Sequence, residues 1–264
     1  MYSLPSYTID QVGEICALPH TSDSAILIDF QEWNTPQAAL QALVEALPDD
    51  YTLHIVGTEG GKRLVHYGEH RDRILSDLRR HVGSLPVLQQ LSAEIDKSLE
   101  LFHAVTDDAY PMISLRIITQ GYLERESPSV SEKYHRDSTS LTLTKCFFGS
   151  GAVYTDDANV RRDFFLRHSI AVRDEDAVLD TTREYTVPDE RWVLLKGEIW
   201  QGIDARSQSL IDYILGPRSS PLDAFKGRGF IHKGGCLRYS SRRLVFNLNS
   251  WKTDFRRRAA SGST

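Results

Sequence analysis

The chain has 264 residues, of which 41% are hydrophobic and 25% charged, and its formal net charge at pH 7 is −5. This composition is typical of a globular protein and argues against disorder, while the acidic balance does not favour a nucleic-acid binder, which would normally be basic. No run of 18 apolar residues occurs that could cross a membrane, and the first residues lack the basic and apolar segments of a secretion signal. We therefore expect a cytoplasmic protein with neither a nucleic-acid nor a membrane partner, and the sequence leaves its oligomeric state open.

The first half of the chain alternates strand and helix patterns. Apolar runs predict strands at 24–30 and 51–57, and apolar residues at helical spacing predict helices at 34–50, 69–81 and 84–105. In the first of these helices we expect Thr35 to be the N-cap and Pro48 to mark the end.

The second half consists mostly of short strand patterns separated by Gly, Pro, Asp and Ser. These predicted strands are 112–120, 140–148, 191–197, 228–232 and 242–249. Helices that precede a run of strands indicate an α+β fold, either with segregated layers or as a β-sandwich with a helical flank. Because no Pro/Ser-rich linker divides the halves, we expect a single domain, 1–264, in which 1–110 forms an N-terminal elaboration.

Several short motifs are better explained by structure than by chemistry. "HYGEH" (66–70) has the letters of one class of zinc peptidases, but Gly68 lies between the histidines and we expect these to be surface side chains. "GTEGGK" (57–62) lacks the Ser or Thr of a phosphate loop, and "GSGAVYTDD" (149–157) is interpreted as a tight β connection. The odd set of Cys16, Cys146 and Cys236 contains no C-x-x-C pair, which predicts neither a disulfide framework nor a zinc ribbon.

The pattern with the most chemical content is "YHRD" (134–137) followed far along the chain by His232. Residues i and i+2 of an extended segment point to the same side, so His135 and Asp137 can meet one ion, and a later strand can supply His232. Two imidazoles and one carboxylate hold Fe(II) on one face and leave other positions open for O₂ and a co-substrate. A chance match remains an alternative for so short a motif.

Two arginines follow His232 at +10 and +11. An iron oxygenase that uses 2-oxoglutarate needs a cation for the far carboxylate of that acid, and a guanidinium suits it because it forms two parallel hydrogen bonds. On a strand, Arg243 shares its face with Val245 and Asn247, whereas Arg242 shares its face with Leu244 and Phe246. We therefore expect Arg243 to bind the co-substrate, with Arg242 as the alternative; the simpler interpretation is a solvated strand start.

With these residues in a strand-rich C-terminal half, the chain resembles the Fe(II)/2-oxoglutarate-dependent oxygenases. More narrowly, "YHRDSTSLTLTKCFFGSGAVYTDDANV", "VLLKGEIWQG" and "GRGFIHKGG…SSRRLVFNLN" resemble the DUF1826 family over roughly residues 112–250. The resemblance implies an α+β fold whose core, 111–252, is a double-stranded β-helix, or jelly roll. The chain departs from the usual pattern of that family in an insert at 203–226, just before the last expected metal ligand, and we expect this insert to be a mobile lid over the pocket.

The resemblance further implies an Fe(II)/2-oxoglutarate-dependent dioxygenase that oxidises an unactivated C–H bond of a small polar molecule, such as an amino-acid derivative in specialised metabolism. The expected cofactors are Fe(II), held by His135, Asp137 and His232, together with 2-oxoglutarate and O₂. The candidate substrate-binding residues flank the site in sequence: Arg116, Tyr134, Lys145, Arg238 and Trp251. Two alternatives remain open: a cupin-like metalloenzyme without 2-oxoglutarate, and a non-catalytic metal-binding or metal-homeostasis protein.

Overall fold

The computed structural model describes residues 3–21, 23–55, 58–59, 62–63, 67–107, 111–125, 132–165, 167–168, 170–198, 229–237 and 241–251. Its helices are α1 (Val12–Ala17), α2 (Gln37–Ala46), α3 (Tyr67–Val82), α4 (Val87–Thr106), α5 (Gln120–Arg125), α6 (Arg162–Phe165) and α7 (Asp174–Ala177). Its strands are β1 (Ser6–Thr8), β2 (Ala25–Asp29), β3 (Thr52–Ile55), β4 (Thr58–Glu59), β5 (Lys62–Arg63), β6 (Met112–Thr119), β7 (Leu141–Phe148), β8 (Val153–Tyr154), β9 (Tyr185–Thr186), β10 (Arg191–Lys196), β11 (His232–Lys233) and β12 (Arg242–Ser250). The protein is a mixed α+β chain, as the sequence predicts.

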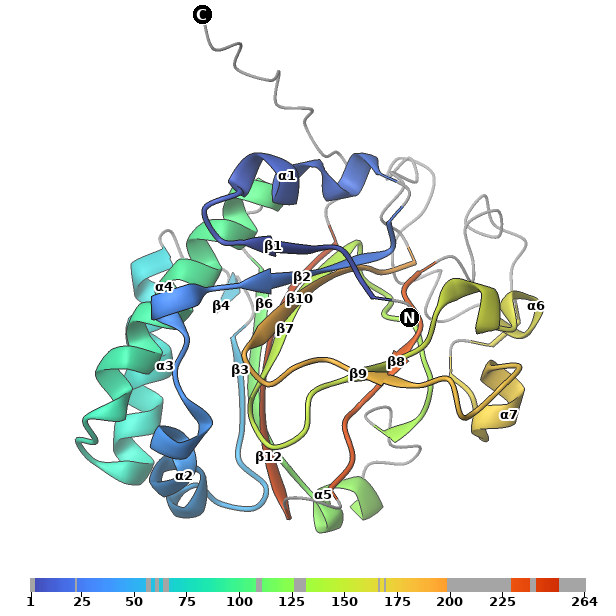
Figure 1. Ribbon diagram of the computed structural model, residues 1–264. Helices are drawn as coiled ribbons and strands as arrows, with labels where there is room; N and C mark the ends of the chain where they lie inside the picture. Colours follow the sequence, from blue (N-terminus) through green and yellow to red (C-terminus); the bar gives the residue numbers. More distant parts are fainter. Residues whose placement is uncertain are drawn as a thin grey trace, which may run out of the picture.

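One large sheet organises the molecule, with seven strands in the order β1-β2-β10-β7-β12-β6-β3 (Figure 1). Neighbouring strands are antiparallel except β1 and β2, which run parallel. The long strand β12 lies between β6 and β7, with Val245 opposite Arg116 on one side and Cys146 on the other. Because β1, β2 and β3 belong to this sheet, the first 110 residues build part of the same layer as the later strands.

A smaller sheet, β11-β8-β9, packs against one face of the large sheet (Figure 1). Tyr154 and Phe230, from the smaller-sheet side, share an apolar cluster with Val193 and Leu195 of β10. The sequence predicts a strand at 228–232, but of the described residues of this segment only His232 belongs to a strand, the short β11. The two sheets leave a pocket between them.

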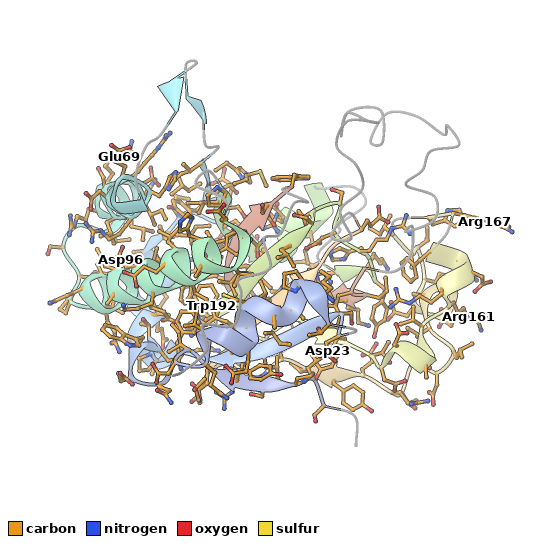
Figure 2. All side chains as sticks on the ribbon, turned by 90° about the horizontal axis from the view of Figure 1, so that it is seen from above. Asp23, Glu69, Asp96, Arg161, Arg167 and Trp192 are labelled. Carbon is orange, nitrogen blue, oxygen red and sulfur yellow. The ribbon has the colours of Figure 1, made fainter. Side chains whose placement is uncertain are left out.

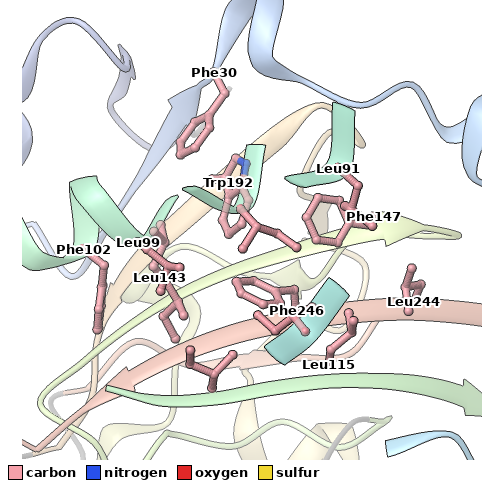
Figure 3. Packing of buried hydrophobic residues seen from close by; sticks show 14 of the residues in the cluster. Phe30, Leu91, Leu99, Phe102, Leu115, Leu143, Phe147, Trp192, Leu244 and Phe246 are labelled. Atoms are coloured by element: carbon pink, nitrogen blue, oxygen red, sulfur yellow. The ribbon is translucent and has the colours of Figure 1, made fainter. Parts of the chain in front are cut away.

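Helices cover the opposite face of the large sheet, where most of the hydrophobic core lies. Side chains from alternate positions of β7 and β12 point to this face, as the two-residue period of a strand requires. They pack against α4, as Figure 3 shows for Leu143 beside Leu99 and for Phe147 beside Leu91. Burial of so many large side chains supplies the main favourable term in folding. This face therefore carries most of the apolar packing.

Trp192 of β10 lies at the centre of this core. Its ring stacks on Phe30 and meets Phe147 edge-on, with ring centroids 4.9 and 5.6 Å apart. Seen from above, Trp192 lies inside the molecule near α4, whereas the labelled charged residues Glu69 and Arg167 lie at its edges (Figure 2). No helix in the described part of the chain has both the length and the apolar character needed to span a membrane.

Two local predictions in the helical half were wrong. The helix expected at 34–50 is the shorter α2, and its N-cap is Pro36 rather than Thr35, whose backbone N–H instead donates to Glu94 Oε2 at 2.7 Å. The histidines of "HYGEH" were expected at the surface, but His70 is fully buried in α3, one turn before the buried Ile74. His66 lies outside the described residues.

Candidate functional site

Two histidines face each other where the segment 132–140 runs beside β11. His135 and His232 form an antiparallel bridge: His135 N–H donates to the His232 carbonyl at 2.8 Å, and the reverse bond measures 3.1 Å. Directly opposed residues on antiparallel strands bring their side chains close together. The two imidazole centroids accordingly lie 4.4 Å apart.

The carboxylate of Asp137 completes a cluster with the two imidazoles. Its Oδ1 lies 3.6 Å from His135 Nε2 and 3.9 Å from His232 Nε2, and one ligand atom from each of the three residues lies within 4.8 Å of the others. Both histidines are buried and Asp137 is half-buried at the pocket. The structure thus brings together the three residues that the sequence pattern singles out as metal ligands; that they bind a metal stays a prediction.

Backbone carbonyls orient the imidazole rings. His135 Nδ1 lies 2.7 Å from the carbonyl of Lys133, and His232 Nδ1 lies 3.4 Å from that of Phe230. A carbonyl oxygen only accepts, so the proton of His135 belongs on Nδ1 and the lone pair on Nε2, toward Asp137. Burial, reinforced by the neighbouring His232, lowers the pKa of His135 to about 4. At neutral pH the ring is therefore neutral, which is the form that binds metal ions.

The residue between His135 and Asp137 anchors the loop to β10. Arg136 is buried and forms an ion pair with Glu198, which follows β10. The backbone N–H of Glu198 donates to the Asp137 carbonyl at 2.9 Å, and Gly197 N–H donates to Ser140 at the same distance. A Cβ at Gly197 would collide with the carbonyl of Thr139, so only glycine permits this close approach. The loop that carries His135 and Asp137 is thereby held to the large sheet.

The two arginines of β12 point to opposite faces of the large sheet. Arg243 lines the pocket, where its Nε–H donates to the carbonyl of Ser150 at 2.8 Å. Arg242 reaches toward the end of α2: it donates to the carbonyl of Leu47 at 2.5 Å and pairs with Asp49 at 3.2 Å. The strand alternation expected from the sequence is confirmed; the co-substrate role of Arg243 stays a prediction.

The pocket lies between the two sheets, with the three candidate ligands at one side. Side chains of alternate β7 and β12 residues line it, and several of them form hydrogen bonds across the two strands. Thr144 Oγ1 donates to Asn247 Oδ1. Beside this pair, Thr142, which also lines the pocket, donates to Oδ1 of Asn249, which does not, at 2.9 Å. Among the described residues the lining is completed by Arg116, Ile118, His135, Asp137, Lys145, Cys146, Gly151, Ala152, Val187, Pro188, Arg191, Val193, His232, Lys233, Gly234, Arg243 and Val245.

The five residues proposed to contact substrate lie in different places. Arg116 lines the pocket from β6. Tyr134 is fully buried in a separate apolar cluster and donates to Glu184 Oε1 at 3.0 Å. Trp251, which follows β12, is not among the described residues that line the pocket. Arg238 lies outside the described residues, as does the whole of the insert 203–226 with its expected lid.

Lys145 directs its ammonium away from the pocket. Although its residue borders the pocket, its ammonium lies on the helix-covered face and pairs with Glu94 of α4. It also donates to Asn34 Oδ1 at 2.8 Å, and its exposed fraction is only 3%. The reason is strand alternation, because Lys145 shares its face with the core residues Leu143 and Phe147. Lys145 is therefore part of a buried charge pair, and its contact with substrate stays a prediction.

A network of charged side chains that the sequence pattern does not predict lies beside His135 and His232. Lys233, directly after His232, donates to Asp174 Oδ2 and Glu184 Oε1, both at 2.6 Å. Glu184 also accepts from Tyr134, directly before His135, so one carboxylate links both ligand segments. No local spacing relates residues 134, 174, 184 and 233, so nothing in the sequence pattern could have shown this network. The pocket threonines, in contrast, follow from the alternation of β7.

Comparison with known proteins gives one family and several distant structural likenesses. The profile of the family described as "Protein of unknown function (DUF1826)" matches residues 35–209. No curated protein matches the sequence significantly.

Among solved structures, the chain is similar to a dioxygenase for auxin oxidation in rice, with 13% identity, a TM-score of 0.45, and coverage of 94% of this chain and 83% of that one. It is also similar to a full-length Neurospora crassa protein crystallised in complex with alpha-KG, with 10% identity, a TM-score of 0.45, and 94% and 84% coverage. For JOX2 in complex with 2OG, Fe and JA the identity is 8%, the TM-score 0.40, and the coverage 98% and 78%.

The family match confirms the resemblance to DUF1826 and corrects its extent. It begins at residue 35, so it includes much of the N-terminal region that the resemblance over 112–250 leaves out. It ends at residue 209, before His232 and Arg243. Since the match covers more than half of the chain, this protein belongs to the DUF1826 family, whose function is not assigned.

Proposed function

We propose that this protein is a non-haem Fe(II)/2-oxoglutarate-dependent oxygenase that oxidises an unactivated C–H bond of a small polar molecule, such as an amino-acid derivative. One observation carries the proposal: two imidazoles and one carboxylate converge at a pocket whose opposite wall presents Arg243. We further propose that the strands of the two facing sheets that lie within 111–252 form the core of a double-stranded β-helix. The large sheet and the smaller sheet with the pocket between them support this architecture.

The donor set fits Fe(II). Two neutral imidazoles and one carboxylate are the ligands of the facial triad, which leaves positions open for further ligands. The carbonyl of Lys133 directs the lone pair of His135 toward the carboxylate of Asp137, as the outer partners of metal-bound histidines do. His135, Asp137 and His232 would hold the ion, and the bound iron would supply the redox chemistry with O₂. The protein's own residues provide binding, orientation and exclusion of water.

Arg243 supplies the feature that favours 2-oxoglutarate. It is buried, faces the pocket, and forms no ion pair with a described carboxylate; its Nε–H donates to the carbonyl of Ser150. A buried guanidinium without a counter-charge is costly, and a carboxylate ligand would remove that cost through charge-assisted hydrogen bonds. A 2-oxoglutarate molecule has one carboxylate for Arg243 and a keto-acid end for the metal.

Anaerobic reconstitution tests the proposal. The metal-free full chain is given one equivalent of Fe(II) and then 2-oxoglutarate, and we expect a weak charge-transfer band in the visible region, followed by succinate formation when O₂ is admitted. The His232→Ala variant is the control that should show neither iron nor band. Iron binding without the band would instead support a jelly-roll metalloenzyme that does not use 2-oxoglutarate. Failure to bind iron would support a non-catalytic metal protein.

A further inference from the structure

A second arginine faces the pocket without a counter-charge. Arg116 lies on β6 on the same side as Ser114 and Ile118, opposite Val245 of β12. Its Nε atom is buried, and no hydrogen-bond partner for it exists among the described residues. Within the part of the chain that the structure describes, Arg116 also forms no ion pair with a carboxylate. A buried donor left unsatisfied costs about 1–3 kcal/mol, so its persistence points to a ligand that is bound in use.

The other cationic residues of the pocket wall are already neutralised. Arg191 pairs with Asp29, Lys233 pairs with Asp174 and Glu184, and Lys145 pairs with Glu94 on the far face. The neighbouring Asn247 does not provide Arg116 with a hydrogen-bond acceptor either. Asn247 Oδ1 accepts from Thr144, so this amide oxygen is engaged across β12 and β7. Arg116 and Arg243 are thus the two pocket cations that lack a carboxylate in the described structure.

The sheet register separates these two arginines. Arg243 lies opposite Ile118 and Arg116 lies opposite Val245, so the two are diagonal neighbours on one face. Such positions are about 7–8 Å apart at their Cα atoms, far enough for each guanidinium to hold its own carboxylate. In the proposed function Arg243 takes the far carboxylate of 2-oxoglutarate and the metal takes the other end. Arg116 is then left for a different anion.

Charge balance indicates what kind of anion. Asp137 is the sole acidic residue among the described residues that line the pocket. With a divalent ion, both arginines and neutral imidazoles in place, Asp137 and a 2-oxoglutarate dianion leave one positive charge unmatched. A carboxylate supplies one negative charge, whereas a phosphate monoester carries about −1.5 to −2 at neutral pH. The apolar neighbours Ile118 and Val245 would cover the rest of a small organic acid.

We propose that Arg116 binds the carboxylate of the substrate, and that the substrate class is small organic acids with one free carboxylate, including amino-acid derivatives that keep it. This inference rests on the proposed function, because it assigns Arg243 and the metal to 2-oxoglutarate. The planar guanidinium matches a carboxylate with two parallel hydrogen bonds, so replacing the acid by its uncharged amide should remove the main contact.

The experiment compares matched acids and amides on the full chain. A panel of small carboxylic acids and their primary amides is titrated, by calorimetry, into wild type, Arg116→Gln, Arg243→Gln and the surface control Arg167→Gln, each loaded anaerobically with Fe(II). We expect at least one acid to bind wild type and Arg167→Gln at least tenfold more tightly than its amide. Arg116→Gln should lose this preference while its affinity for 2-oxoglutarate changes less than threefold. Arg243→Gln should show the opposite behaviour.

The outcomes separate the two proposals. If no acid binds wild type better than its amide, or if Arg116→Gln keeps the preference, the assignment of Arg116 is overturned. If Arg116→Gln also loses 2-oxoglutarate, Arg116 belongs to the co-substrate site and the inference fails. If wild type binds no 2-oxoglutarate, the proposed function fails, yet the acid–amide comparison without 2-oxoglutarate still decides the role of Arg116. Should the glutamine variant not fold, Arg116→Lys replaces it, and unchanged acid affinity there contradicts the proposal.

Discussion

The two faces of the large sheet differ sharply although the same strands build both. On β12, Leu244, Phe246 and Leu248 enter the helix-covered core, whereas Arg243 and Asn247 face the pocket. One face is closed by apolar packing against α4, and the other keeps polar groups beside a cavity. Residues that stabilise the fold therefore alternate along β12 with residues that line the pocket. Single substitutions should thus affect either stability or function without the other.

The largest expected effect is on the pocket side. Replacing His135, Asp137 or His232 by Ala removes one of three ligands, so stoichiometric Fe(II) binding should be lost while the fold survives, because these residues contribute little to the main core. Metal content after anaerobic loading tests the loss of iron binding, and the thermal unfolding midpoint tests whether the fold survives. Full iron content in His232→Ala would rule out the ligand assignment.

The core side offers the converse case in the pair Lys145 and Glu94. Lys145→Met leaves Glu94 buried and unpaired, which should cost about 3–5 kcal/mol of unfolding free energy without changing metal affinity. Urea unfolding measures the cost, and Arg167→Gln at the surface is the control. The double variant with Glu94→Leu should recover only part of it, because Trp192 Nε1 and the Thr35 N–H lose their acceptor. Full recovery would show that these two bonds contribute nothing.

Two neighbouring arginines of β12, Arg242 and Arg243, point to opposite faces of the sheet and should differ in their effect on the co-substrate. Arg243→Ala should weaken 2-oxoglutarate binding at least tenfold while iron still binds, since truncating a buried charge pair costs about 2–5 kcal/mol. Arg242→Ala should change it little, because that side chain serves the end of α2. Titration of 2-oxoglutarate into both variants, followed by succinate formation, provides the measurement. A large defect in Arg242→Ala alone would reverse the assignment.

The smallest effect concerns pH and the helical layer. Burial lowers the pKa of His70 in the folded protein below the ordinary value of about 6.5. Below that value the unfolded chain binds a proton that the folded chain resists, so acidification should reduce stability by at most about 1.4 kcal/mol per pH unit from this group. In His70→Leu the decline between pH 6.5 and 5 should be shallower than in wild type. Equal slopes in denaturant unfolding would mean that another group dominates.

Most of the secondary structure follows from the sequence, because strand alternation and helical spacing are local. The expected segments at 112–120, 140–148 and 191–197 correspond closely to β6, β7 and β10. The family match and the α+β class agree with expectation as well. What the sequence did not predict depended on partners far along the chain: the N–H of Thr35 donates to Glu94 instead of Thr35 capping α2, and Lys145 pairs with the same carboxylate.

The sequence by itself determined which residues of β12 share a face, since the two-residue period of a strand is a property of the backbone. It also singled out His135 and Asp137, whose i and i+2 spacing in extended chain brings them to one side. Only the tertiary structure decided that His232 bridges His135, that Glu184 links Tyr134 to Lys233, and that Arg116 faces the pocket without a counter-charge. These relations join residues that are distant in sequence, and their contacts depend on how two sheets pack rather than on any local pattern.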